Sequence, residues 1–110
     1  MTNVRFFRSQ TGAYTAFETW GHAGHGSAGN DIVCAAVSAS TELVISILEQ
    51  FSIPTSIEIE ETAARVYCSL SPINDSEETT VTHILDGYRD YLLSVSKEYP
   101  KHLKCTIITE

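Results

Sequence analysis

The sequence predicts an α+β fold, a sandwich-like domain in which a mostly antiparallel sheet carries two helices. Two long segments show the apolar spacing of helices, and five short segments alternate between apolar and polar residues as half-buried strands do. Their order along the chain is ββαββαβ. With 110 residues, 43% of them hydrophobic and 19% charged, residues 1–110 are expected to form a single domain around one core.

The first two strands are expected to form a hairpin. Residues 4–8 alternate in part, and the turn signal Gln10-Thr11-Gly12 follows them. Residues 13–20 then alternate between two faces, so that the chain is predicted to fold back on itself here.

The segment from Asp31 to about Gln50 gives the strongest helix signal. Pro54 lies past its end, and Asn30 or Asp31 is a natural N-cap. Apolar residues recur at helical spacing, and others widen their surface until little remains to face water. These are Ile32, Ala36, Leu43, Ile47 and Phe51, widened by Val33, Ala35, Val37, Val44 and Leu48. We therefore expect a core helix that is buried on most sides.

The second half of the chain repeats two strands and a helix, and then adds a strand. Residues 56–60 and 64–70 alternate strictly, which predicts a hairpin with one solvated face. Asp75 with Glu78 three residues later resembles an N-cap pair, and the helix that follows ends at Pro100. Residues 103–108 alternate as the last strand. The predicted apolar face of the second helix is Val81, Ile84, Leu85, Tyr88, Leu92, Val95 and Tyr99.

The chain is acidic, with a formal net charge of −7, and its basic residues are scattered. Binding to phosphates requires clustered positive charge, so we expect no direct contact with nucleic acid. An acidic domain is better suited to a basic peptide or protein. The seven basic residues are Arg5, Arg8, Arg65, Arg89, Lys97, Lys101 and Lys104.

Location and redox state follow from two further observations. The N-terminus lacks the sections of a signal peptide, and no apolar run approaches the ~20 residues of a membrane span. We therefore expect a cytoplasmic protein without a membrane segment. Its three cysteines, Cys34, Cys68 and Cys105, are expected to be reduced. Cys68 and Cys105 alternate with apolar strand neighbours and are interpreted as core residues.

Residues 21–36 carry the chemistry that the sequence predicts. His22 stands before a glycine-rich segment, and Cys34 falls in the first turn or so of the expected helix. Helix-end N–H groups and a nearby imidazolium both favour the reactive thiolate. A flexible loop would let His22 fold back onto Cys34 as the base of a cysteine nucleophile. The alternatives are a packed core cysteine and a solvated loop histidine. The glycines of the predicted flexible loop are Gly21, Gly24, Gly26 and Gly29.

Other polar residues near this segment have two interpretations each. Asp31 can orient His22, as a carboxylate does in a triad, or it can stabilise the helix start. Ser38 lies one helical turn after Cys34 on the same face, where it can bond within the site or to the helix carbonyl. His25 is a weaker candidate base. His22, His25 and Cys34 together could also supply the three ligands of a catalytic zinc, although we predict no metal site.

Residues 21–38 closely resemble the signature of the bacterial ribosomal-processing cysteine protease family Prp. They match the pattern Gly-His-Ala-x-x-Gly-x-x-Gly-x-Asp-Ile-Val-Cys-Ala-Ala-Val-Ser without a departure at its fixed positions. Outside this segment the likeness rests on the ββαββαβ order and on chain length. These two features extend it more loosely over the whole domain.

The resemblance implies an endopeptidase that uses His22 and Cys34 as a catalytic dyad, with Asp31 and Ser38 as supporting polar residues. It implies a homodimer without a cofactor, and a glycine-rich loop that rearranges when the peptide arrives. The implied substrate is the N-terminal extension of large-subunit ribosomal protein twenty-seven, removed after a phenylalanine-rich stretch.

Two other classes of protein remain open. A non-catalytic ribosome-assembly or peptide-binding module would use Cys34 only as a core residue, and its thiol would be buried against alkylation. A small metal-binding protein would contain stoichiometric zinc that chelators remove.

Overall fold

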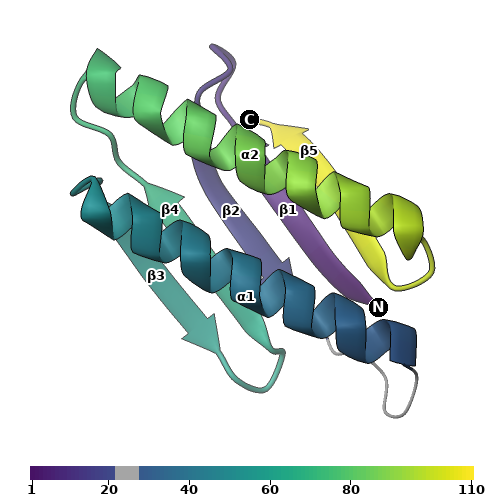
Figure 1. Ribbon diagram of the computed structural model, residues 1–110. Helices are drawn as coiled ribbons and strands as arrows, with labels where there is room; N and C mark the ends of the chain where they lie inside the picture. Colours follow the sequence, from purple (N-terminus) through teal and green to yellow (C-terminus); the bar gives the residue numbers. More distant parts are fainter. Residues whose placement is uncertain (22–27) are drawn as a thin grey trace.

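The computed structural model describes residues 1–21 and 28–110. Its elements follow the predicted order ββαββαβ (Figure 1). The strands are β1 (Thr2–Arg8), β2 (Tyr14–Trp20), β3 (Thr55–Glu60), β4 (Arg65–Leu70) and β5 (Leu103–Thr109). The helices are α1 (Ala28–Gln50) and α2 (Asp75–Glu98).

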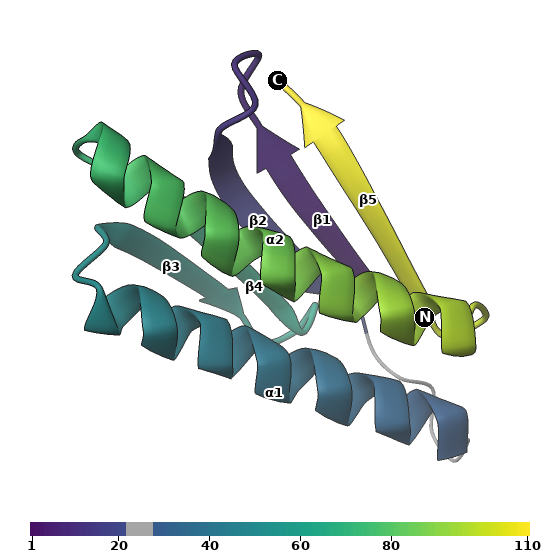
Figure 2. The same cartoon turned by 45° about the horizontal axis from the view of Figure 1, so that its top comes forward.

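The five strands form one sheet in the order β3-β4-β2-β1-β5. Both predicted hairpins are present, and every neighbouring pair is antiparallel except β1 and β5, which are parallel. Both helices lie on the same side of this sheet (Figure 2), which makes the domain a two-layer α+β structure as predicted.

The core lies between the sheet and the helices. Tyr88 of α2 stands at its centre, with its ring edge-on to Phe6 at 5.4 Å and to Phe17 at 5.3 Å between centroids. The Tyr88 hydroxyl lies 2.6 Å from Thr41 Oγ1 on α1, so this side chain joins both helices to the sheet. The predicted apolar face of α2 is confirmed, since five of its seven residues are buried and the other two, Ile84 and Tyr99, are partly buried against the core. The five buried residues are Val81, Leu85, Tyr88, Leu92 and Val95.

Only one face of α1 is buried, so the predicted burial on most sides is wrong. Ile32 and Leu43 of the predicted stripe are exposed, because the helix packs through a stripe rotated by one residue. In a two-layer fold a helix contacts the sheet on one side and its neighbour on another, and its outer side faces water. The buried stripe consists of Val33, Val37, Thr41, Val44 and Leu48.

The start of α1 also differs from the prediction. The helix begins at Ala28, so Gly29 and Asn30 lie inside it and neither Asn30 nor Asp31 is its cap. Glycine and asparagine are tolerated in a first turn, where backbone N–H groups need no partner within the helix. Cys34 is therefore in the second turn of α1, farther from the helix end than predicted.

The expectation that no apolar segment approaches the length of a membrane span is wrong for α1. Residues Asp31–Gln50, 20 in number, are long and apolar enough to cross a membrane by length and composition alone. In the structure this segment packs its buried stripe into the core and exposes Glu42 and Glu49. A core helix of a compact domain can pass the same test.

The cap of α2 is Asn74 rather than the predicted Asp75. The Asn74 side chain accepts a hydrogen bond from the Glu77 backbone N–H at 2.9 Å. The Glu77 side chain in turn accepts from the backbone N–H of Ile73 at 3.0 Å. The N-cap and the acidic side chain three residues after it are thus both present one residue earlier than the sequence suggested, although Glu77 bonds to the residue before the cap and not to the cap itself as in a capping box.

The apolar face of β3 is uncovered, although its alternation predicts only one solvated face. Ile57 is 39% exposed and Ile59 is 71% exposed. β3 is an edge strand, and the two helices cover mainly the strands inward from it.

Candidate active site

The candidate catalytic segment leaves the sheet at the end of β2. Gly21 follows this strand with a φ of 100°, a conformation that favours glycine. Its N–H donates to the carbonyl of Ala63, in the turn between β3 and β4, at 3.3 Å. A Cβ at Gly21 would lie 2.5 Å from the Met1 carbonyl oxygen. The position of the residue before His22 is therefore fixed by backbone contacts on two sides.

The polar residues predicted on α1 share one flank of this helix. Asp31, Cys34 and Ser38 are separated by three and four residues, which places them on neighbouring turns of the same side. Cys34 is half-buried, whereas Asp31 and Ser38 are exposed. Ala36, Ser40 and Leu43 of α1 line a hollow shared with α2, so by helical spacing Asp31, Cys34 and Ser38 lie on the flank away from α2.

Several predicted site residues lie outside the described residues. These are His22, His25, Gly24 and Gly26, so the pairing of His22 with Cys34 and the zinc alternative both remain predictions. Within residues 1–21 and 28–110, no three His, Cys, Asp or Glu side chains are placed to hold a metal ion.

The three thiols differ in their surroundings, and none forms a disulfide. Cys68 is fully buried on β4, and Cys105 on β5 is partly buried against the core. Burial raises the pKa of both thiols to about 11, because it disfavours the charged thiolate. The sequence interpretation of these two cysteines as core residues is confirmed. Cys34, by contrast, lies on a helix, half-buried on the flank of α1 that also carries Asp31 and Ser38.

An ion-pair cluster supports the end of β2, and sequence reasoning did not identify it. The Glu18 carboxylate is buried on the sheet face opposite the helices, 2.6 Å from Arg65 Nε and 3.6 Å from an Arg5 nitrogen. Arg5 also stacks over the ring of Trp20 at 4.5 Å. Three neighbouring strands are thereby joined at Glu18, three residues before Gly21. The available sequence signal was the alternation of charged residues on strands that are central to the sheet.

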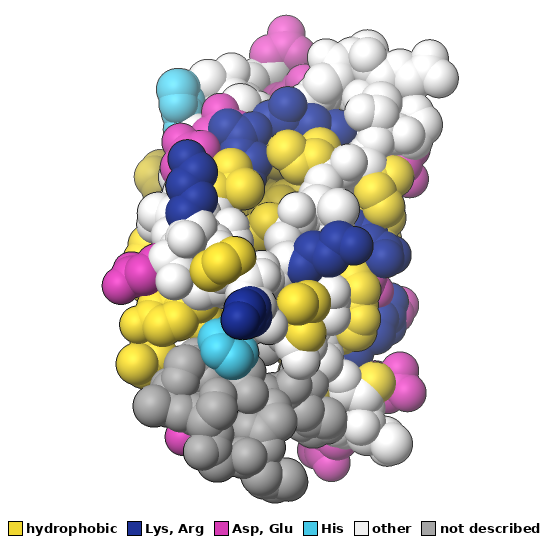
Figure 3. Space-filling view, turned by 90° about the vertical axis from the view of Figure 1, so that its right-hand side faces the viewer, with side chains coloured by type: hydrophobic (Ala, Val, Ile, Leu, Met, Phe, Trp, Pro, Cys, Tyr) yellow, Lys and Arg dark blue, Asp and Glu magenta, His cyan; other side chains and the backbone are white. Residues whose placement is uncertain are grey.

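Basic side chains do not form a single patch on the face that contains β5. Figure 3 shows Lys and Arg at several separate places on this face, with hydrophobic side chains between them. The scattered distribution read from the sequence is therefore also seen in three dimensions on this side of the molecule.

A protein-family model described as cysteine protease Prp matches residues 1–104. No sequence among the curated proteins matches this chain. The fold is similar to that of SMU.848 from Streptococcus mutans, with a TM-score of 0.86 and 27% identity, covering 100% of this chain and 96% of that one.

The fold is also similar to that of the essential ribosomal processing protease Prp from S. aureus. Its complex with a substrate peptide matches with a TM-score of 0.85 and 22% identity, covering 98% of this chain and 100% of that one. Its complex with a covalently linked product peptide matches with a TM-score of 0.83 and 24% identity, over the same shares of both chains.

Proposed function

Because the chain belongs to the cysteine protease Prp family, we propose that it cleaves a ribosomal protein precursor during ribosome maturation. The substrate of the proposed reaction is the N-terminal extension of large-subunit ribosomal protein twenty-seven, removed after a phenylalanine-rich stretch. The observation that carries the proposal is the common flank of Asp31, Cys34 and Ser38 on α1. These are the polar positions that the family signature places on this helix.

In the proposed mechanism Cys34 is the nucleophile and His22 is the general base. His22 takes the thiol proton, and the thiolate sulfur forms a bond to the carbonyl carbon of the scissile peptide. Backbone N–H groups near the start of α1 are proposed to stabilise the oxyanion. The protonated His22 then gives its proton to the leaving amine, and water hydrolyses the thioester. No step of this mechanism needs a cofactor.

Because Cys34 lies inside α1 and not at its end, stabilisation of the Cys34 thiolate depends more on His22 than on the helix end. The effect of a helix end on charge falls off within about one turn, and Cys34 lies in the second turn of α1. A nearby imidazolium is then the main group that would stabilise the thiolate. We propose that Asp31 orients this imidazole and that Ser38 bonds within the site.

We also propose that the protein acts in the cytoplasm, because its proposed substrate is a ribosomal protein and ribosomes assemble there.

We also propose that the protein is a homodimer, with the outer surface of the helices as the interface. A hollow of about 480 Å³ lies between α1 and α2, and small residues such as Ala39 and Gly87 contribute to its lining. Leu43 and Tyr91 line it too, and they are 60% and 47% exposed. A second copy would cover these apolar side chains, and light scattering would show the mass of a dimer.

The proposed function is tested by incubating the protein with a peptide that contains the phenylalanine-rich stretch, and by measuring product masses. We expect a single cut after that stretch, which is lost in Cys34→Ala and in His22→Ala. Circular dichroism of both variants checks that they are folded. Cleavage by Cys34→Ala at a rate close to that of the unchanged protein would refute the assignment of the nucleophile.

A further inference from the structure

The outer edge of β3 has the features of a strand that accepts a partner strand. In the described part of the chain no strand pairs with this edge. All residues of β3 from Ser56 onward are exposed, and the strand has apolar side chains on one face and carboxylates on the other. Exposed edges of this kind are usually blocked by charged side chains, proline or a bulge, because they otherwise bind an extended chain. The charges on β3, Glu58 and Glu60, are both acidic, so they oppose an acidic partner but not a basic one.

The hydrogen-bond register identifies which backbone groups of β3 are free. Ser71 N–H donates to the Pro54 carbonyl at 2.9 Å, and this pair continues the register of β3 with β4. In an antiparallel ladder, bonded pairs alternate with non-bonded pairs. Ser56, Glu58 and Glu60 therefore bond to β4. The N–H and C=O groups of Thr55, Ile57 and Ile59 point to the free edge.

The side chains of β3 define the chemistry of the partner strand. Residues opposite each other in an antiparallel pair share a face of the sheet. In a strand beside β3, every second side chain would therefore lie next to Ile57 and Ile59, where an apolar residue fits. The side chains between them would lie next to Glu58 and Glu60, where a basic residue fits. The Glu58 side chain is 69% exposed, and the two charged groups of its ion pair with Arg65 are 3.9 Å apart. The complementary partner alternates apolar and basic residues.

A second copy of this chain is a poor partner for this edge. Antiparallel pairing of two β3 strands about a two-fold axis normal to the sheet places residues of the same parity opposite each other. With Glu58 or Ile59 on the axis, Glu58 then faces a glutamate of the other copy, whereas with Ile57 on the axis it faces Ser56. Like charges directly opposite each other destabilise a strand pair. The charge pattern therefore favours a basic peptide over self-association.

The free edge also leads toward Cys34. β3 follows α1 after a short connection and runs back along it. Cys34 lies roughly 24 Å before the end of α1 at 1.5 Å per residue, whereas β3 covers roughly 16 Å of this distance. An extended chain beside β3 reaches the level of Cys34 about two residues beyond Glu60. There the turn between β3 and β4 bonds to Gly21 through Ala63.

From these observations we infer that β3 is the substrate-binding strand of the enzyme, and this inference rests on the proposed function. The bound segment is extended and antiparallel to β3, with apolar and basic residues in alternation. Because the chain then runs from Cys34 toward Thr55, this segment follows the scissile bond by about two residues. The backbone bonds supply affinity, and Glu58 and Glu60 supply the preference for basic residues.

The experiment measures binding in the Cys34→Ala variant, so that it does not depend on cleavage. The probe is a fluorescent eight-residue peptide that alternates valine and lysine, and the control peptide alternates valine and glutamate. Bound lysine peptide should slow hydrogen exchange at the Ile57 and Ile59 amides and leave that of Glu58, already bonded to β4, unchanged. N-methylation of the valines should weaken binding by about tenfold or more, whereas N-methylation of the lysines should not.

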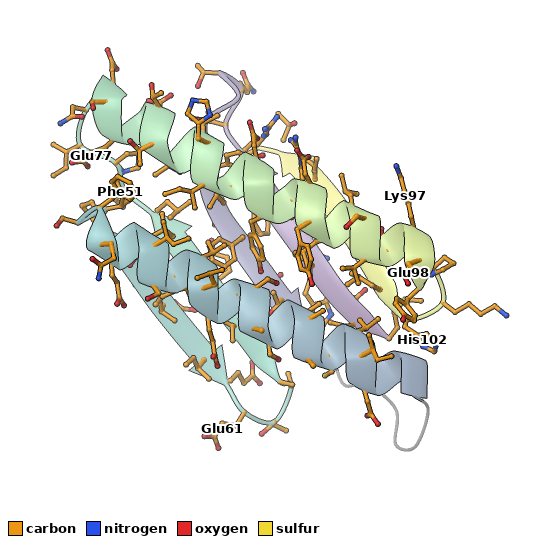
Figure 4. The ribbon with its side chains drawn as sticks, viewed as in Figure 1. Phe51, Glu61, Glu77, Lys97, Glu98 and His102 are labelled. Atoms are coloured by element: carbon orange, nitrogen blue, oxygen red, sulfur yellow. The ribbon has the colours of Figure 1, made fainter. Side chains whose placement is uncertain are left out.

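Charge variants provide a second readout. Glu60→Lys should weaken binding of the lysine peptide by several-fold and strengthen that of the glutamate peptide. Glu98→Lys makes the same change of charge at the far end of α2, well away from the turn that carries Glu61 (Figure 4), and should have little effect.

Equal binding of both peptides, or no protection at Ile57 and Ile59, would overturn the inference about β3. The proposed function would survive that result if the unchanged protein still cleaved its peptide through Cys34. Conversely, protection of β3 in a protein that cleaves nothing would leave the inference of a binding strand standing and refute the enzymatic role.

Discussion

The hydrogen bond between Tyr88 and Thr41 predicts that removing its donor and removing its acceptor lower the stability of the protein by different amounts. Both side chains are buried, and their oxygens are 2.6 Å apart. Thr41 Oγ1 donates its own proton to the Val37 carbonyl at 2.6 Å. The Tyr88 O–H must therefore donate to Thr41. This bond connects α2 to α1 two turns after Cys34, so it helps to fix the helix that carries the candidate nucleophile.

Loss of the donor, in Tyr88→Phe, and loss of the acceptor, in Thr41→Val, should lower the free energy of unfolding by different amounts. Tyr88→Phe removes one neutral hydrogen bond and leaves Thr41 bonded to Val37, which should lower the free energy of unfolding by about 1 kcal/mol. Thr41→Val leaves the Tyr88 hydroxyl buried without an acceptor, which should cost roughly 2–3 kcal/mol. In the double variant no orphaned hydroxyl remains. Adding Tyr88→Phe to Thr41→Val should then cost almost nothing.

Urea unfolding of the four proteins, followed by the fluorescence of the single tryptophan, measures all three differences. Two results would refute the reasoning. Equal costs for the two single variants would contradict the assigned direction of the bond. Additive costs in the double variant would mean that the two hydroxyls do not interact.

Two further predictions concern stability and the start of the candidate loop. Burial raises the pKa of Cys68 and Cys105 from 9.0 to about 11, so the stability that the protonated thiols contribute is complete below pH 9. It should be lost as the pH rises from 9 to about 11, by about 1.4 kcal/mol per pH unit for each thiol. Denaturant unfolding at a series of pH values measures this decline, and a decline just as steep in Cys68→Ala would contradict the assignment. Gly21→Ala should destabilise the protein by about 2 kcal/mol or more, because the added Cβ meets the Met1 carbonyl at 2.5 Å in a positive-φ residue. Gly12→Ala is its control, since Gly12 also has a positive φ but nothing lies within 4 Å of an added Cβ. Equal losses in the two variants would exclude a role for the contact with Met1.

Local sequence pattern was sufficient for the order and type of the elements, because strict alternation and helical spacing are properties of neighbouring residues. It could not choose between two apolar stripes on α1. The stripe through Ile32 and Leu43 and the stripe through Val33 and Val44 differ by one residue. Only contacts with the sheet and with α2 decide which one is buried. The uncovered face of β3 has the same origin, since alternation predicts an apolar face but not its covering.

Sequence reasoning could predict those parts of the candidate site whose residues are close together in the sequence. The common flank of Asp31, Cys34 and Ser38 follows from helical spacing, and the structure has the helix there. The contacts of Gly21 with Ala63 and Met1 join parts of the chain that are far apart in sequence, so no local pattern could show them. The buried Glu18 between two arginines is a similar case, because it depends on the pairing of three strands.

The central claim is that Cys34 is the nucleophile of a peptidase, and site-directed covalent labelling tests it most directly. The protein would be incubated with a chloromethyl ketone of a short peptide that ends in phenylalanine, and the modified residue would be located by mass spectrometry. We predict one adduct, on Cys34, with Cys68 and Cys105 unmodified and no adduct in Cys34→Ala. An unmodified Cys34, or an adduct on Cys68 or Cys105 instead, would contradict the account.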